Sequence, residues 1–180
     1  VVQEPLKVTI TNYEKDNETL LLENNPEADV KENREVHFSK TIYIEKEDFM
    51  EDPPSKFFRL TTGKEVRLKG AYIIKAESVL KDNEGNVSEV MCTYDPKSKS
   101  GSGTLESQRK VKGTLHWVSA ENSVDLEIRE YDRLFNHQSP GDFDPSEFNS
   151  ILNKDSVKIY NGYGESAIQK TSPNEPVQFQ

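Results

Sequence analysis

A period-two alternation of apolar and polar residues, repeated along much of this chain, constrains its fold more than any other feature. Leu6, Val8 and Ile10 alternate with polar neighbours, and Val66 and Leu68 do the same. Successive side chains of a β-strand point to opposite faces, so this period predicts strands with one buried and one solvated face. The pattern recurs later in the chain, with Val111, Leu115 and Trp117 on one face and then Val124, Leu126 and Ile128 on another.

Turn-forming residues separate these expected strands. Residues 82–86, DNEGN, lie between two strand-like segments and predict a hairpin. Residues 95–108, DPKSKSGSGTLESQ, predict a flexible polar loop. Many short strands joined by such turns indicate an all-β fold, a barrel or a sandwich.

One short helix is expected near residues 145–152. Asp144 is a candidate N-cap, Pro145 suits the first helical position, and Glu147 stands three residues after the cap. Apolar residues then follow at helical spacing, namely Phe148, Ile151 and Leu152.

The cysteine content and the apolar runs limit the class of protein. Cys92 is the single cysteine, so the chain has no internal disulfide and no cysteine-based zinc site. The apolar runs are far shorter than the ~20 residues of a membrane span, and no signal peptide is visible in the opening residues. We expect a cytoplasmic protein without a membrane partner. The missing initiating Met indicates a piece of a longer polypeptide.

Charge is segregated along the chain, although the formal net charge is −9. Residues 14–51 contain twelve acidic and five basic side chains, whereas residues 56–75 contain six basic and one acidic. The run RKVK at 109–112 adds a second basic group beside a tryptophan. The chain therefore combines an acidic flank with a basic strand pair, which net charge alone conceals.

Recognisable catalytic and metal-binding patterns are absent from the sequence. The three histidines are far apart and have no metal-ligand spacing, and no nucleophile elbow or glycine-rich phosphate loop occurs. The run PKSKSGSG at 96–103 resembles a nucleotide-ligase loop only superficially, because it lacks the expected Met and links two strands. We therefore predict no catalytic residue, no metal site and no cofactor in this chain.

Basic residues interleaved with aromatic ones favour binding of single-stranded nucleic acid. Phosphates attract the cations, and unstacked bases need flat side chains and hydrogen-bonding groups. The residues concerned are Phe57, Phe58, Arg59, Arg67, Lys69 and Tyr72. From the pattern alone, solvated strand faces remain the alternative interpretation.

Several longer stretches resemble one known family. DPPSKFFRLTTGKEVRLKGAYIIKAE, CTYDP, RKVKGTLHWVSA and EIREYDRLF are similar to the C-terminal anticodon-binding region of glutaminyl-tRNA synthetase, as are PLKVTITNY and REVHFSKTIYIEKEDF. The resemblance covers nearly the whole chain. Archaeal and eukaryotic glutamyl-tRNA synthetases share the architecture and are the nearest rival, but the HWVSA form favours the glutaminyl enzyme.

The resemblance implies an all-β fold of two antiparallel β-barrels with one short helix, similar to a ribosomal protein that binds 5S RNA. A proximal barrel would be built from residues 1–57 and 117–180, and a distal barrel from residues 58–116. The chain would cross back into the proximal barrel at HWVSA. Trp117 is then expected in the core.

The resemblance also implies which side chains contact the anticodon. Arg67 and Lys69 match two arginines near the first anticodon base, and Lys69 departs from the family by losing the planar fork. Arg59 matches an arginine at the third base, and Gln178 matches a glutamine at the middle base. Phe58 stands where some members carry a lysine.

Other lysines are predicted to contact phosphates rather than bases. They are Lys64, Lys110 and Lys112. The parent enzyme implied by the resemblance would join glutamine to tRNA(Gln) with ATP and Mg²⁺, in a catalytic domain of the same polypeptide that lies outside this chain, and would act as a monomer. A protein-interaction module that uses the acidic flank and a carbohydrate-binding β-domain are the alternatives from other classes.

Overall fold

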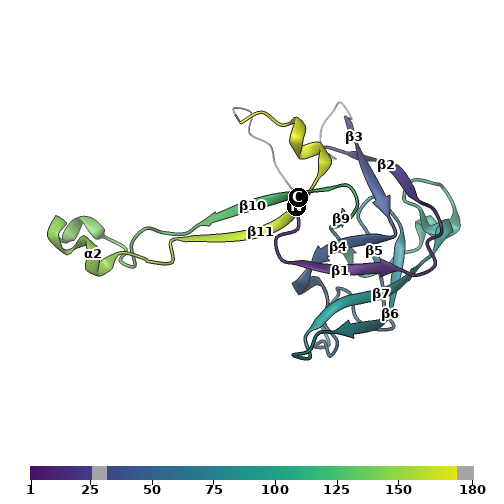
Figure 1. Cartoon of the computed structure of the whole chain (residues 1–180), viewed down its shortest axis with the longest axis horizontal. Helices are drawn as coiled ribbons and strands as arrows, with labels where there is room; N and C mark the ends of the chain where they lie inside the picture. Colours follow the sequence, from purple (N-terminus) through teal and green to yellow (C-terminus); the bar gives the residue numbers. More distant parts are fainter. Residues whose placement is uncertain (26–31, 174–180) are drawn as a thin grey trace.

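The alternating residues fold into strands that make up a rounded body and a long two-stranded ribbon extending from it (Figure 1). The structure is a computed structural model and describes residues 1–25 and 32–173. The strands are β1 (Pro5–Ile10), β2 (Asn17–Glu23), β3 (Asn33–Ser39), β4 (Thr41–Glu45), β5 (Glu65–Leu68), β6 (Ile73–Lys81), β7 (Val87–Tyr94), β8 (Thr114–Leu115), β9 (Val118–Ser119), β10 (Ser123–Tyr131) and β11 (Val157–Glu165). The helical turns are η1 (Lys46–Asp48), η2 (Pro96–Ser98), α1 (Leu105–Gln108), η3 (Pro140–Asp142), η4 (Pro145–Glu147), α2 (Phe148–Ile151) and η5 (Ser166–Lys170).

Seven strands form one sheet in the order β8-β5-β6-β7-β1-β4-β9. The edge strands β8 and β9 are separated in sequence only by His116 and Trp117. A step of three residues spans at most about 11 Å, so the two edges lie close together and the sheet must curl into a barrel-like shape. The fold is therefore all-β, as expected. The pairings of β1 with β7 and of β5 with β8 are parallel, and the others are antiparallel.

The apolar faces predicted from the alternation form the core of the body. Leu6, Val8 and Ile10 of β1 are buried, and so are Val66 and Leu68 of β5. The hairpin β2–β3 adds its own apolar face to the same continuous core. The predicted hairpin at residues 82–86 is also confirmed, because it joins the antiparallel strands β6 and β7.

An aromatic cluster lies within this core. Its members are Tyr13, Phe38, Tyr72, Tyr94 and Trp117, and their contacting rings have centroids between 5.1 and 5.3 Å apart. Trp117 is 2% exposed, which confirms its predicted place in the core. Its indole N–H donates a hydrogen bond to the carbonyl oxygen of Lys69 at 3.0 Å, so the buried polar atom is satisfied.

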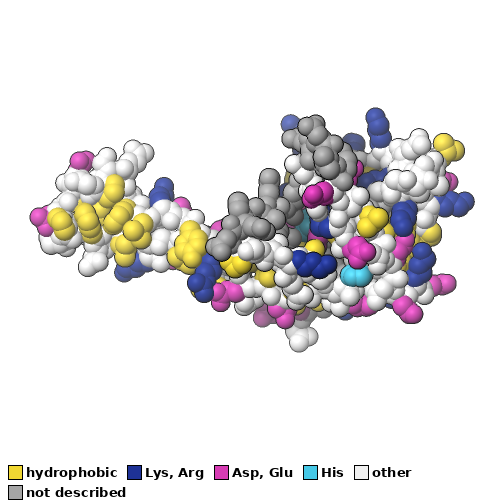
Figure 2. Space-filling model, turned by 90° about the horizontal axis from the view of Figure 1, so that it is seen from above, with side chains coloured by type: hydrophobic (Ala, Val, Ile, Leu, Met, Phe, Trp, Pro, Cys, Tyr) yellow, Lys and Arg dark blue, Asp and Glu magenta, His cyan; other side chains and the backbone are white. Residues whose placement is uncertain are grey.

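The ribbon of β10 and β11 is the least buried part of the fold. Nine residue pairs join the two strands, from Ser123 with Glu165 to Tyr131 with Val157. Val124, Leu126 and Ile128 are only half-buried, so the predicted alternation is present but its apolar face is not fully covered. Apolar side chains are gathered along the far end of the ribbon and its tip (Figure 2).

The predicted helix lies at this tip. Asp144 accepts from the backbone N–H of Ser146 at 2.9 Å, and the carboxylate of Glu147 accepts from the N–H of Asp144 at 3.2 Å. The capping box is thus confirmed. The helix is shorter than expected, because its first turn is the 3₁₀ turn η4 and α2 ends at Ile151.

The seven-stranded sheet takes strands from all three predicted ranges. Residues 1–57 supply β1 and β4, residues 58–116 supply β5 to β8, and β9 follows Trp117. The division into a proximal and a distal barrel at these boundaries stays a prediction.

In the described ranges 1–25 and 32–173, none of the helices has the length and apolar character to cross a membrane. Cys92 is buried, and its burial raises the pKa of the thiol to about 12, so the thiol stays protonated at neutral pH.

Candidate nucleic-acid interface

The predicted site residues Arg67 and Lys69 share one face of the strand segment that runs from β5. Burial of Val66 and Leu68 on the opposite face turns the two cationic side chains outward. The backbone N–H groups of Arg67 and Lys69 donate to the carbonyl oxygens of Gly113 and Leu115, both at 2.9 Å. The parallel pairing with β8 therefore fixes the backbone positions from which both side chains extend.

The guanidinium of Arg67 is held by the segment that follows β7. Its Nη1 donates to the carbonyl oxygen of Ser98 at 3.0 Å and to Oγ of Ser100 at 3.1 Å. Its Nη2 donates to the carbonyl oxygens of Ser107 at 2.9 Å and Arg109 at 3.3 Å. Burial, with the like charge of Arg109, lowers the pKa of Arg67 from its ordinary value.

The polar segment at residues 95–108 is folded, so the prediction of an irregular flexible loop is wrong. Asp95 caps the 3₁₀ turn η2, and the hydroxyl of Thr104 accepts from the N–H of Ser107 at 3.1 Å at the start of α1. Ser98 is completely buried, and its hydroxyl accepts from the N–H of Ile73 at 2.8 Å. Here serine and threonine hydroxyls accept hydrogen bonds from backbone N–H groups. A prediction that treats serine and glycine only as linker residues misses these contacts.

The basic run at 109–112 lies just before β8 and not on a strand, which corrects the sequence prediction. Arg109 forms ion pairs with Glu65 and with Asp95, the latter at 3.4 Å. Lys110 is exposed. The ammonium of Lys112 lies 5.2 Å from the ring centroid of Phe58, which is 51% exposed.

A close backbone approach explains why Lys112 and Phe58 meet. Gly113 is buried, and a Cβ added there would lie 2.1 Å from the carbonyl oxygen of Phe58. Any larger residue would therefore separate the two segments. The same approach places Arg59, the next residue after Phe58, near the basic run.

The third predicted cation, Arg59, forms ion pairs with two acidic residues. Its Nη1 lies 2.7 Å from Oε1 of Glu47 and 3.2 Å from Oδ1 of Asp48. Burial raises the pKa of Asp48 and Arg59 opposes that rise. The hydrogen bond from Arg59 to Glu47 raises the pKa of the arginine, so Arg59 stays positively charged. The same bond occupies Nη1, one of the nitrogens that a ligand would need.

The four predicted lysines have ammonium groups that make no hydrogen bond or ion pair with a described residue. Lys64 and Lys110 are exposed, and Lys69 is half-buried beside Trp117. None of these three, nor Lys112, forms a side-chain hydrogen bond or an ion pair with another described residue. Gln178 lies outside the residues that the structure describes.

The structure thus brings together part of the predicted set. Arg67, Lys69, Lys112 and Phe58 adjoin through β5, β8 and Gly113. Arg59 and Arg67 each contact other residues rather than one another. In chemical terms the surface offers free ammonium groups and an exposed ring, which suit phosphates and unstacked bases.

Two family models match the chain on either side of this folded segment. Both are described as "tRNA synthetases class I (E and Q), anti-codon binding domain", and they match residues 1–95 and 114–180. The chain belongs to this anticodon-binding family. The sheet strands β1, β4 to β7 and β9, and the ribbon, lie within the two matched ranges.

Curated relatives agree with this family. The chain is 46% identical to a glutamine–tRNA ligase of Clostridium kluyveri over 97% of this chain and 31% of the relative. It is 45% identical to one of Rhodopirellula baltica over 99% of this chain and 30% of the relative, and 44% identical to one of Vibrio parahaemolyticus over 99% and 32%. The anticodon-binding chain therefore spans about a third of the length of these relatives.

Sequence reasoning missed one ion pair that joins distant parts of the anticodon-binding chain. Arg34 on β3 donates to Glu165 at the end of β11 through Nε at 2.6 Å and through Nη2 at 3.0 Å. Burial favours the neutral carboxyl, but the hydrogen bonds and charge of Arg34 outweigh it and hold the pKa of Glu165 below its usual value. No local pattern links residues so far apart in sequence, so no signal in the sequence could have found this pair.

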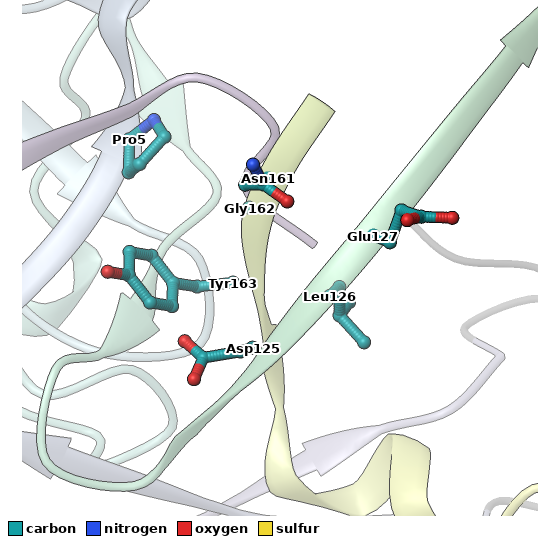
Figure 3. Close-up of a pocket in the computed structure, with 7 residues that line it drawn as sticks. All are labelled: Pro5, Asp125, Leu126, Glu127, Asn161, Gly162 and Tyr163. Atoms are coloured by element: carbon teal, nitrogen blue, oxygen red, sulfur yellow. The ribbon is translucent and has the colours of Figure 1, made fainter. Parts of the chain in front are cut away.

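A pocket of about 290 Å³ lies where the ribbon meets the body. Among the residues that line this pocket, Pro5, Asp125 and Tyr163 lie on the same side of the ribbon (Figure 3). Tyr163 stacks on Tyr43 with ring centroids 4.4 Å apart. The pocket has two carboxylates and none of the predicted cations that the structure describes, so it is unsuited to phosphate. Among the described residues, no cluster of three or more potential metal ligands occurs.

Proposed function

We propose that this chain is the anticodon-reading part of a glutamine–tRNA ligase and that it binds the anticodon loop of tRNA(Gln). The observation that carries the proposal is the free cationic and aromatic surface around β5, within a chain of this family. Support for glutamine comes from the relatives, which bear the name glutamine–tRNA ligase. A catalytic domain elsewhere in the same polypeptide would use ATP to attach glutamine.

We propose that two residues contact bases directly. Lys69 would contact the first anticodon base, and Arg59 would contact the third after exchanging Glu47 for the base edge. Lys64, Lys110 and Lys112 would contact phosphates, because their ammonium groups form no hydrogen bond or ion pair with a described residue, and Lys112 contacts only the ring of Phe58. The resemblance gives Gln178 the middle base. A cytoplasmic location and a monomeric state belong to the same proposal and rest on the resemblance and on the single cysteine.

The two base contacts give a crossed test with this chain and tRNA transcripts. Lys69→Ala should reduce discrimination at the first anticodon base and leave the third unchanged, whereas Arg59→Ala should do the reverse. Each lost contact should cost about 1–3 kcal/mol of discrimination. The measurement is the Kd of each variant for the tRNA(Gln) transcript and for transcripts substituted at one anticodon position.

A matched control separates base reading from loss of positive charge. Lys158 is exposed on the ribbon, away from the proposed surface, so Lys158→Ala should leave both discriminations and the affinity unchanged. Binding by the unaltered chain should be weak and should fall steeply with salt. Equal binding to all anticodon variants would refute the proposal, and tighter binding of a tRNA(Glu) transcript would assign the chain to the glutamate branch of the family.

A further inference from the structure

The guanidinium of Arg67 has little hydrogen-bonding capacity left for a ligand. Its two terminal nitrogens already make four hydrogen bonds, Nη1 to Ser98 and Ser100 and Nη2 to Ser107 and Arg109. Only the Nε–H remains outside this set. A bidentate contact with a base edge would require two parallel N–H groups, and both terminal nitrogens are in use.

The acceptors lie at the two ends of one folded segment. Ser98 and Ser100 precede the turn at residues 101–104, and Ser107 and Arg109 follow it. One planar side chain therefore joins both ends of the segment, as a crosslink would. Three of the four acceptors are backbone carbonyl oxygens, so the contact depends on the fold of the segment rather than on its side chains.

Other contacts fix the same segment to the body. The N–H of Ser100 donates to the carbonyl oxygen of Ala71 at 2.8 Å. The ammonium of Lys99 forms an ion pair with Glu18 of β2, which also accepts from the hydroxyl of Tyr72 at 2.6 Å. The segment is thus attached to both β5–β6 and the β2–β3 hairpin.

The held segment presents cations at its two ends. Lys97 and Lys110 are exposed, and neither ammonium has an ion-pair partner among the residues described. Lys97 is the residue before Ser98, and Lys110 is the residue after Arg109, and both Ser98 and Arg109 accept from Arg67. A chain without this crosslink would let the two ammonium groups vary in position, and each would then bind phosphate less well.

We infer that Arg67 is a positioning residue, which closes the segment 98–109 so that Lys97 and Lys110 contact tRNA phosphates outside the anticodon bases. The inference rests on the proposed function. It gives Arg67 a role other than the base contact implied by the resemblance, and it adds Lys97 to the residues that bind RNA. The partner chemistry is the phosphate backbone, which carries no sequence information.

The test uses the 180-residue chain with Arg67→Lys, Arg67→Ala and the double variant Lys97→Gln/Lys110→Gln. Three quantities are measured for each: the Kd for tRNA(Gln) transcript at several salt concentrations, discrimination at the first anticodon base, and the rate of tryptic cleavage after Lys99 and Arg109, which every variant keeps. Arg67→Lys keeps the charge but cannot reach both ends of the segment, so it should behave like Arg67→Ala.

We expect both Arg67 variants to weaken binding of all transcripts by the same factor and to leave first-base discrimination intact. The slope of log K against log salt should fall in magnitude by about 1–2, because up to two phosphate contacts are lost. Cleavage in the segment should become faster. The double lysine variant should show the same loss of slope, and adding Arg67→Ala to it should weaken binding little further.

Three results would overturn the inference. Loss of first-base discrimination with unchanged cleavage would make Arg67 a base-reading residue. Faster cleavage with unchanged affinity and salt slope would make the segment purely structural. Full affinity of the double lysine variant would also overturn the inference, whether or not Arg67→Ala folds correctly. Failure of the proposed function is distinguishable, because the unaltered chain would then bind all transcripts alike while Arg67 variants still changed the cleavage rate.

Discussion

The body and the ribbon of this chain are built from the same alternating pattern but stabilised differently. In the body, Ile42 and Ile44 of β4 are fully buried, whereas on the ribbon Ile159 and Tyr131 are 60% and 71% exposed. The body also has the four lysines of the proposed surface and the exposed ring of Phe58. Alternation thus specifies strands in both regions, but the apolar face becomes a core only where the sheet curls or another element packs on it.

The difference indicates which region stabilises the fold and which region presents the proposed RNA-binding surface. The ribbon is a two-stranded hairpin whose cohesion within the described residues comes mainly from its own ladder, and such hairpins are marginal in isolation. The body has a continuous core under a cationic surface. Substitutions in the body should therefore alter unfolding strongly, and those on the outer ribbon hardly at all.

The largest effect is expected for Trp117→Ala. The side chain is 2% exposed and packs on Phe38 with ring centroids 5.1 Å apart, so its removal leaves a large cavity. The free energy of unfolding should fall by about 3–5 kcal/mol. Urea denaturation followed by circular dichroism measures it, and a loss below ~1 kcal/mol would mean that the body lacks the close-packed core described above.

A smaller effect is expected for Arg34→Ala, because it leaves the carboxylate of Glu165 half-buried without its partner. Unfolding should become easier by about 1.5–3 kcal/mol near neutral pH. Since Arg34 holds the pKa of Glu165 below its unfolded value, this stability is present above the unfolded pKa and is lost as pH falls through the folded pKa.

The pH dependence of this pair is a separate check. Denaturation between pH 7 and pH 3 should show the difference between the unaltered chain and Arg34→Ala shrinking as the carboxyl becomes protonated. Glu165→Gln is the matched control, and Arg34→Ala in that background should add a pH-independent effect only. A difference that stays constant through the acidic range would exclude the ion pair as its cause.

Gly113→Ala should act on the surface of the body as well as on its stability. The new Cβ would meet the carbonyl oxygen of Phe58, so the two segments must separate, at a cost of about 1–3 kcal/mol. Lys112 would then move from the ring of Phe58. Gly141→Ala on the tip, where a Cβ meets nothing within 4 Å, is the control and should be neutral. Equal stability of both variants would contradict the close approach.

The smallest effect is expected on the ribbon. Ile159→Ser replaces an exposed side chain, so the free energy of unfolding, measured by urea denaturation, should change by less than ~0.5 kcal/mol. Ile42→Ser, at a buried position of the body, is the comparison and should be severely destabilising. If both substitutions cost the same, the ribbon is as firmly packed as the body and the contrast between them fails.

The sequence predicts the faces of strands better than it predicts their partners. Val66 and Leu68 are buried as the alternation indicates, because the period of a strand is a local property. The parallel pairing of β5 with β8 and the contact of Arg34 with Glu165 depend on residues far apart in the chain, and no local pattern encodes them.

The candidate site shows the same limit. The types of residue needed for RNA binding are visible in the sequence, and Lys69 and Lys112 do lie at one surface. The sequence predicts a flexible loop for the folded segment after β7, since serine and glycine favour loops in general. Its structure comes from hydroxyl contacts and from Arg67, which only the arrangement in space reveals.

Hydrogen–deuterium exchange of the chain with and without tRNA(Gln) transcript tests the central claim most directly. Backbone amides report protection segment by segment, so the body surface and the ribbon are compared in one experiment. We predict that tRNA slows exchange at residues 58–69 and 97–115 and leaves residues 124–131 and 157–164 unchanged. Protection confined to the ribbon, or protection at residues 58–69 that is the same with an anticodon-substituted transcript, would contradict the assignment of anticodon binding to the body.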